Sequence, residues 1–219
     1  MFQGFNKDTI TYYETIRRDN SRIAHKENET LYLEGVKYPL EEMYYELYNY
    51  FNRLDNCLLS NKRRCISSAY NDARFSKENP IKEYFYLRFK LEKADNKNVL
   101  GFFLDAALDG YRYGLNIYHM DAKGMERIRD VILDNKHYAT ETIQKFNTCG
   151  LLELQGERFK KDNYPKESAV LREWLERKRI SLYHEENINS SFFNREIIDQ
   201  MFSAFDSVKD IYFMLKEAL

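Results

Sequence analysis

The sequence has 219 residues, 43% of them hydrophobic, which is enough to bury the core of one globular domain. The 35 acidic and 34 basic residues nearly balance, so the formal charge of -1 gives no general attraction to nucleic acid or to an anionic membrane. Its 3 cysteines are widely spaced, which excludes a disulfide framework or a paired-cysteine zinc site, and no stretch approaches about 20 apolar residues. We expect a soluble, cytoplasmic protein with a single domain over residues 1–219, no membrane contact and reduced cysteines.

The N-terminal quarter is predicted to be helical. Apolar residues recur at helical spacing from Lys7 to Arg18, and a second helix is expected from about Arg22 to Val36. Pro39 suits the first turn of a third helix, because the missing amide hydrogen has no partner there. An apolar stripe then continues that helix to Leu54.

The central part of the chain is predicted to form a sheet. A strand is expected within residues 62–71, and the sequence from Tyr84 to Glu92 alternates between apolar and polar side chains, as a half-buried strand does. Asp109 and Gly110 separate two further alternating runs, which predicts a hairpin with a type I′ turn. Consecutive antiparallel strands favour an α+β fold over a doubly wound parallel sheet.

The C-terminal half is predicted to be mainly helical. Asp121 and Ser168 are expected to cap helices, and a helix between them is expected to end at Gly150. Residues 151–154 and 158–160 are predicted to form a small hairpin, residues 180–183 a short strand, and residues 192–219 one or two terminal helices. The predicted fold is therefore an antiparallel sheet with a central hairpin, packed against N-terminal and C-terminal helices.

One loop stands out as a candidate ligand site. It carries Asp72, Arg74 and Lys77 directly before the alternating strand. A guanidinium group offers a planar fork of donors for phosphate or carboxylate, and lysine adds a point charge. On the polar face of the strand, Arg88 and Lys90 extend this basic surface. Asp72 and Arg74 have an alternative role as a purely structural ion pair.

Three functions remain open at this level. The first is a cytoplasmic protein that binds a small phosphate- or carboxylate-bearing ligand at the loop. The second is an enzyme for such a metabolite, with Asp72 as general acid or base. The third is an interaction module that docks a partner, or a second copy, through Tyr111 and Tyr113. The sequence has no phosphate loop, nucleophile elbow, zinc motif or dinucleotide fingerprint, so no cofactor or metal is expected, and nucleic acid is not expected as a partner.

A set of short motifs resembles the uncharacterised domain-of-unknown-function family 2461. These are Phe2, Gly4 and Phe5; Asn20, Ser21 and Arg22 followed by Tyr32; the block from Asp72 to Lys77; Gly101 and Phe102 with Asp109, Gly110 and Gly114; and Ile128 with Arg129. The resemblance spans nearly the whole chain. It implies a single-domain microbial protein without an established activity, and it adds Arg22 and Arg129 to Asp72, Arg74 and Lys77 as candidate ligand contacts.

The chain also departs from that family pattern. Ile23, Ala24 and His25 stand where the family usually carries an acidic residue, Trp and Phe. The usual Lys-Thr pair after the central block is absent around residues 81–83, and the glycine-rich end of the hairpin is reduced to Gly114. A ligand pocket that depends on those family residues would be altered in this chain.

Overall fold

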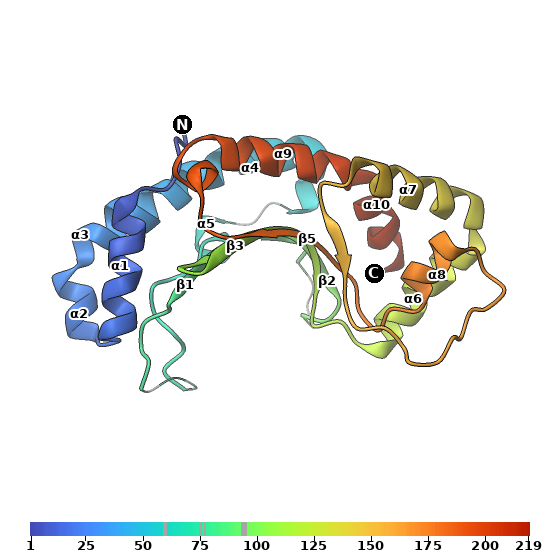
Figure 1. Ribbon diagram of the computed structural model, residues 1–219, viewed down its shortest axis with the longest axis horizontal. Coiled ribbons are helices and arrows are strands. Elements are labelled where there is room, and N and C mark those ends of the chain that lie inside the picture. The colour runs from blue at the N-terminus through green and yellow to red at the C-terminus, as the bar shows by residue number, and fades with distance from the viewer. Residues whose placement is uncertain (59–60, 75, 77, 93–95) are drawn as a thin grey trace. The chain divides into compact units, whose positions relative to one another are not determined.

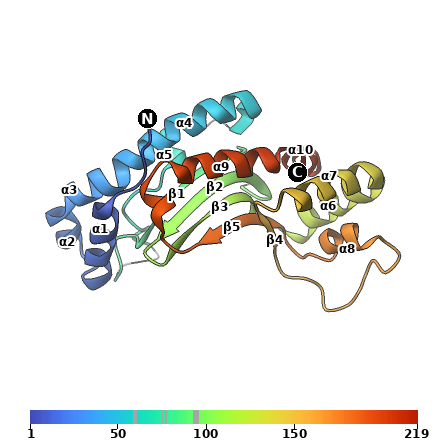
Figure 2. The same ribbon diagram turned by 45° about the horizontal axis from the view of Figure 1, so that its top comes forward.

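The computed structural model describes residues 1–58, 61–74, 76, 78–92 and 96–219. Within these ranges the chain forms an α+β fold with a five-stranded antiparallel sheet. The sheet consists of β1 (Tyr84–Lys90), β2 (Val99–Ala107), β3 (Gly110–Tyr118), β4 (Glu153–Gln155) and β5 (Ser181–Glu186). These strands lie in the order β1-β2-β3-β5-β4, as Figure 2 shows.

The helices fall before and after the central hairpin of the chain (Figure 1). The N-terminal group contains α1 (Lys7–Arg18), α2 (Arg22–Glu27), α3 (Glu29–Tyr32), the π-helical turn η1 (Leu33–Lys37), α4 (Tyr38–Leu54), the 3₁₀ turn η2 (Asn56–Leu58) and α5 (Lys62–Cys65). The C-terminal group contains α6 (Ala122–Asp134), α7 (Lys136–Cys149), α8 (Ala169–Leu175), the 3₁₀ turn η3 (Ser190–Phe193), α9 (Glu196–Ser207) and α10 (Lys209–Ala218).

Two compact units share the chain, and each is assembled from separate segments. The first unit comprises Met1–Phe89, Phe103–Tyr113 and Glu185–Met201, and the second comprises Lys90–Phe102, Gly114–His184 and Phe202–Leu219. Both units are therefore discontinuous in sequence. The prediction of a single domain over residues 1–219 remains a prediction.

In the first unit, the alternation of β1 creates one apolar and one polar face. Phe85, Leu87 and Phe89 are all at most 2% exposed. Helix α4 covers this face, since Tyr44 stacks on Phe89 with ring centroids 5.5 Å apart. Tyr84, Tyr86 and Arg88 project from the other face, because side chains alternate along a strand. The apolar face of β1 thus packs against helix α4, and its polar face does not take part in this packing.

In the second unit, local capping signals set the helix ends. The Asp121 side chain accepts a hydrogen bond from the Gly124 amide and begins α6, and Ser168 caps α8 in the same way. Gly150 ends α7 with a left-handed φ of 62°. The single tryptophan, Trp174, packs edge-on against Phe146 and is 1% exposed. These three predicted helix boundaries are confirmed.

Four predicted local structures are wrong in whole or in part. The expected helix over residues 22–36 is divided into α2, α3 and η1, with Asn28 at the first break. Residues 62–65 form α5 instead of a strand, because the Asn61 side chain caps the Arg64 amide. The turn of the central hairpin lies at Leu108 and Asp109, and neither Asp109 nor Gly110 has the positive φ of a type I′ turn.

The fourth error concerns the predicted hairpin between residues 151–154 and 158–160. Strand β4 pairs antiparallel with β5 instead, so that Leu154 lies opposite Leu182. Arg158 makes an isolated bridge with Arg177. The true partner of β4 is nearly 30 residues away in the sequence, beyond the reach of a local pattern.

Candidate functional site

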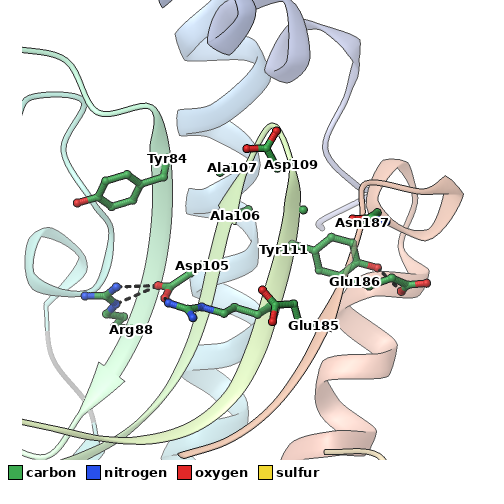
Figure 3. A pocket seen from close by; sticks show the side chains of 12 residues that line it. Tyr84, Arg88, Asp105, Ala106, Ala107, Asp109, Tyr111, Glu185, Glu186 and Asn187 are labelled. Carbon is green, nitrogen blue, oxygen red and sulfur yellow. Dashed lines mark hydrogen bonds and ion pairs between the residues drawn. The ribbon is translucent and has the colours of Figure 1, made fainter. Parts of the chain in front are cut away.

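An open pocket lies on the polar side of the sheet in the first unit. Its volume is about 800 Å³, within the roughly 300–1,000 Å³ typical of small-molecule sites. Strands β1, β2, β3 and β5 and the β2–β3 turn contribute to it (Figure 3). The lining residues are Tyr84, Arg88, Asp105, Ala106, Ala107, Asp109, Gly110, Tyr111, Arg112, Glu185, Glu186 and Asn187. The pocket therefore combines charged side chains with a sheet that fixes their positions.

Small residues line the pocket next to the turn. Ala107 and Gly110 flank the turn formed by Leu108 and Asp109. A Cβ atom added to Gly110 would lie only 2.6 Å from the backbone oxygen of Glu186, so no larger residue fits there without moving β5. Gly110 therefore allows β3 and β5 to approach each other closely at this end of the pocket.

Two arginines and one aspartate from three neighbouring strands, β1, β2 and β3, form a cluster at the pocket. Arg88 donates from Nη2 to Asp105 Oδ1 at 2.8 Å, and Arg112 donates from Nη2 to Asp105 Oδ2 at 3.2 Å. Asp105 is only 17% exposed, whereas Arg112 is 47% exposed. The guanidinium carbon of Arg88 also lies 3.9 Å from the centroid of the Tyr86 ring, which fixes its plane. The three side chains carry a formal charge of +1 in total.

The turn side of the pocket is held by an arginine from α1. Arg17 donates to both carboxylate oxygens of Asp109, at 3.1 and 3.3 Å, and its Nε lies 3.8 Å from Glu83. The hydrogen bond with Asp109 raises the pKa of Arg17 above its usual value. The Asp109 carboxylate, although 83% exposed, is therefore oriented and neutralised by a second element.

The β5 side of the pocket carries two carboxylates with different surroundings. Glu186 accepts a hydrogen bond from the Tyr111 hydroxyl at 3.0 Å, and the Asn189 side-chain oxygen lies 3.4 Å from the same hydroxyl. Burial, followed by this contact with Glu186, raises the pKa of Tyr111, which stays a neutral donor. Glu185 is exposed, and no hydrogen bond or ion pair of its side chain occurs among the described residues.

The candidate contacts on the central loop pair with each other. Arg74 donates from Nε to Asp72 Oδ1 at 3.0 Å and from its backbone amide to the same oxygen at 3.0 Å. The bond from the Arg74 side chain lowers the pKa of Asp72, which favours the ionised form over a general acid. Neither residue lines the pocket, and Arg74 is 80% exposed. Lys77 lies outside the described residues.

The two candidates suggested by the family resemblance have local partners. In the first unit, the guanidinium of Arg22 lies 5.8 Å from the centroid of the Tyr70 ring. In the second unit, Arg129 is 8% exposed and donates to the carbonyl oxygens of Leu175 and Arg177, at 2.9 and 2.7 Å. Arg129 thereby binds carbonyls at the end of α8, where helices leave them without partners. Neither Arg22 nor Arg129 lines the pocket described above.

The Tyr-rich hairpin does not present a docking surface at the expected side chains. Tyr111 is 2% exposed and Tyr113 is 4% exposed. Both side chains are therefore covered, so neither is open to dock a partner. Of the pocket residues, the sequence analysis named Arg88 as part of a basic surface, Tyr111 as a docking residue, and Asp109 and Gly110 as the hairpin turn. Asp105 and Arg112 could have been found from the same alternation, applied to the polar face of the hairpin.

The fold and the site define an α+β protein with a pocket on one face of an antiparallel sheet, lined by both acidic and basic side chains. A family model described as "Conserved hypothetical protein (DUF2461)" matches residues 8–213 of the chain. The chain therefore belongs to this family, which confirms the resemblance noted in the sequence. No curated protein matches it significantly.

Three further features concern membrane spans, metal ligands and cysteines. No helix in the described ranges is both long and apolar enough to cross a membrane. The side chains that the structure describes include no group of three or more His, Cys, Asp or Glu residues arranged to hold a metal ion. The described residues Cys57, Cys65 and Cys149 form no disulfide, and Cys65 is buried whereas the other two are exposed.

Proposed function

We propose that the protein binds a small carboxylate- or phosphate-bearing molecule in the sheet pocket, through the guanidinium groups of Arg88 and Arg112. The observation that carries this proposal is the sharing of Asp105 by both arginines. Both guanidinium groups converge on one carboxylate inside the pocket, and guanidinium forks match carboxylate and phosphate oxygens.

The pocket supports this role better than the central loop does. At the loop, one carboxylate faces one guanidinium, so Asp72 neutralises Arg74 on an exposed surface. In the pocket, Arg88 is 25% exposed and Asp105 is 17% exposed, and reduced contact with water strengthens each charged contact. We therefore keep the phosphate- or carboxylate-bearing ligand expected from the sequence, but we propose that it binds in the sheet pocket and not at the central loop.

The proposed setting is the cytoplasm of a microbial cell. Two of the free cysteines, Cys57 and Cys149, are exposed to solvent. Exposed thiols persist in the reducing cytoplasm, whereas oxidising compartments favour disulfides. The microbial origin follows the family resemblance.

Substitution of Arg112 by Met tests the proposal, because methionine keeps an unbranched stem and removes the charge. Isothermal titration with a panel of sugar phosphates, nucleotides and small carboxylates should give at least one ligand for the unchanged protein. Arg112→Met should lower the affinity for that ligand about tenfold or more, because a hydrogen bond to a charged group contributes about 1.5–3 kcal/mol.

Arg18→Met is the matched control. Arg18 is an exposed arginine on α1 that lies near Glu14 and does not line the pocket. It should leave the affinity unchanged, and circular dichroism should show that both variants keep the fold. If no anion of the panel binds, or if Arg112→Met binds the ligand as tightly as the unchanged protein, the proposal is wrong.

A further inference from the structure

The charges around the pocket are separated into two sides. On one side, Arg88, Asp105 and Arg112 sum to +1. On the β5 side, next to β3, Glu185 and Glu186 belong to the lining (Figure 3). An anionic ligand that contacts the arginines of the first side would also meet the acidic groups of the second.

The acidic groups of the lining differ in how far the protein already satisfies them. Asp109 is bound through both oxygens by Arg17. Glu186 receives the hydroxyl donor of Tyr111. Glu185 is the acidic group of the described lining for which the structure supplies no donor. Its exposed carboxylate is therefore available to a donor from a ligand.

A protonated amine is the ligand group that suits this position best. It supplies three donors and a positive charge, whereas a hydroxyl group supplies one donor and no charge. Charge-assisted hydrogen bonds are roughly twice as strong as neutral ones. An amine at Glu185 would also offset the repulsion that the acidic side exerts on the anionic end of the ligand.

We propose that the ligand of the pocket is a zwitterionic metabolite, with its carboxylate or phosphate at Arg88 and Arg112 and its protonated amine at Glu185. This inference rests on the proposed function and narrows its ligand class from anions to anions that also carry an amine. Amino acids and amino-sugar phosphates both have this chemistry, and the experiment separates them.

Two pairs of compounds that differ chiefly in the amine test the inference. The first pair is 6-aminohexanoate with hexanoate, and the second is glucosamine 6-phosphate with glucose 6-phosphate. Isothermal titration at pH 7 should show that the amine-bearing member of at least one pair binds the unchanged protein at least tenfold more tightly than its partner. The pair that shows the preference identifies the anionic group.

Three variants then assign the two ends of the ligand. Glu185→Gln should abolish the preference for the amine and leave the affinity for the plain anion unchanged or slightly higher. Arg112→Met should weaken both members of the pair. Glu27→Gln, at an exposed glutamate on α2 that does not line the pocket, should behave like the unchanged protein.

The possible results separate this inference from the proposed function. Equal affinity for the amine-bearing and plain compounds would overturn the inference of a zwitterionic ligand and leave the proposal of anion binding in place. A preference for the amine that survives Glu185→Gln would overturn the assignment to Glu185. If none of the four compounds and no anion of the wider panel binds, the proposed function and this inference both fail.

Discussion

His25 is a buried histidine whose protonation should make stability depend on pH. The residue is 6% exposed, and its Nδ1 lies 2.8 Å from the hydroxyl of Tyr12. The rings of Tyr32 and Tyr70 also pack against it. Burial lowers the pKa of His25 below its usual value, and the nearby carboxylate of Glu29 opposes this only in part. The folded protein therefore favours the neutral ring.

The free energy of unfolding should fall as the pH drops below about 6.5, the usual pKa of histidine. The unfolded chain takes up a proton there more readily than the folded protein does, so protons favour unfolding. The stabilising contribution is complete above that pH and is lost toward the lowered pKa, with a slope of at most about 1.4 kcal/mol per pH unit.

Urea unfolding at pH 7.5, 6.5 and 5.5 measures this effect. His25→Gln should be less stable at pH 7.5 and should lose most of the slope in this range. His137→Gln is the control, because the His137 side chain is 87% exposed. A slope that is the same in His25→Gln as in the unchanged protein would show that other groups cause it.

At the same scale, the sequence predicted residue types better than residue roles. It identified Arg88 as part of a polar surface, because strand alternation is a local property. It could not show that Asp105 joins Arg88 to Arg112, since this contact depends on the order of three strands. Arg74 has the chemistry of an anion contact, but a carboxylate two residues away, Asp72, binds its guanidinium group.

At the scale of elements, the first turn of α1 packs directly on η1 through Gly35. A Cβ atom at Gly35 would lie 2.4 Å from the backbone nitrogen of Thr9 and 2.6 Å from the carbonyl carbon of Asp8. The Thr9 hydroxyl donates to the Gly35 carbonyl oxygen across the same contact. Because backbone atoms form both sides, neither side can move away by changing a rotamer.

Gly35→Ala should therefore separate α1 from η1 and destabilise the protein by about 1–3 kcal/mol, as overpacking typically does. Urea unfolding measures the loss. Glu34→Ala, at the exposed neighbouring position in the same turn, should change stability by less than about 0.5 kcal/mol. Equal stability of the two variants would show that the helices can separate without cost.

The elements predicted correctly are those whose ends are set by adjacent residues. Helices α6 and α8 begin at Asp121 and Ser168, and α7 ends at Gly150, all from signals within one turn. The elements predicted wrongly depend on residues far away in the sequence or on competing local signals. Strand β4 exists because of β5. Asn61 caps α5 in a stretch whose composition resembled a strand.

For the whole molecule, the discontinuity of the first unit makes a prediction about truncation. Residues 1–89 form its first segment, but the residues that complete the packing come from the end of the chain. Phe5 stacks on Phe192, with ring centroids 4.6 Å apart, and Arg195 donates to Glu46 at 2.8 Å. A fragment that ends at Phe89 would lose both contacts, as well as the strand segments that line the pocket.

We therefore expect the fragment of residues 1–89 to lack a cooperative thermal transition, whereas the full chain should unfold in a sigmoidal transition. Phe5, which is 2% exposed in the intact protein, would be uncovered where Phe192 is missing. Circular dichroism melts and limited proteolysis of the two chains make the comparison. A sharp transition and a protease-resistant core in the fragment would identify an autonomous N-terminal domain and contradict the prediction of one domain over residues 1–219.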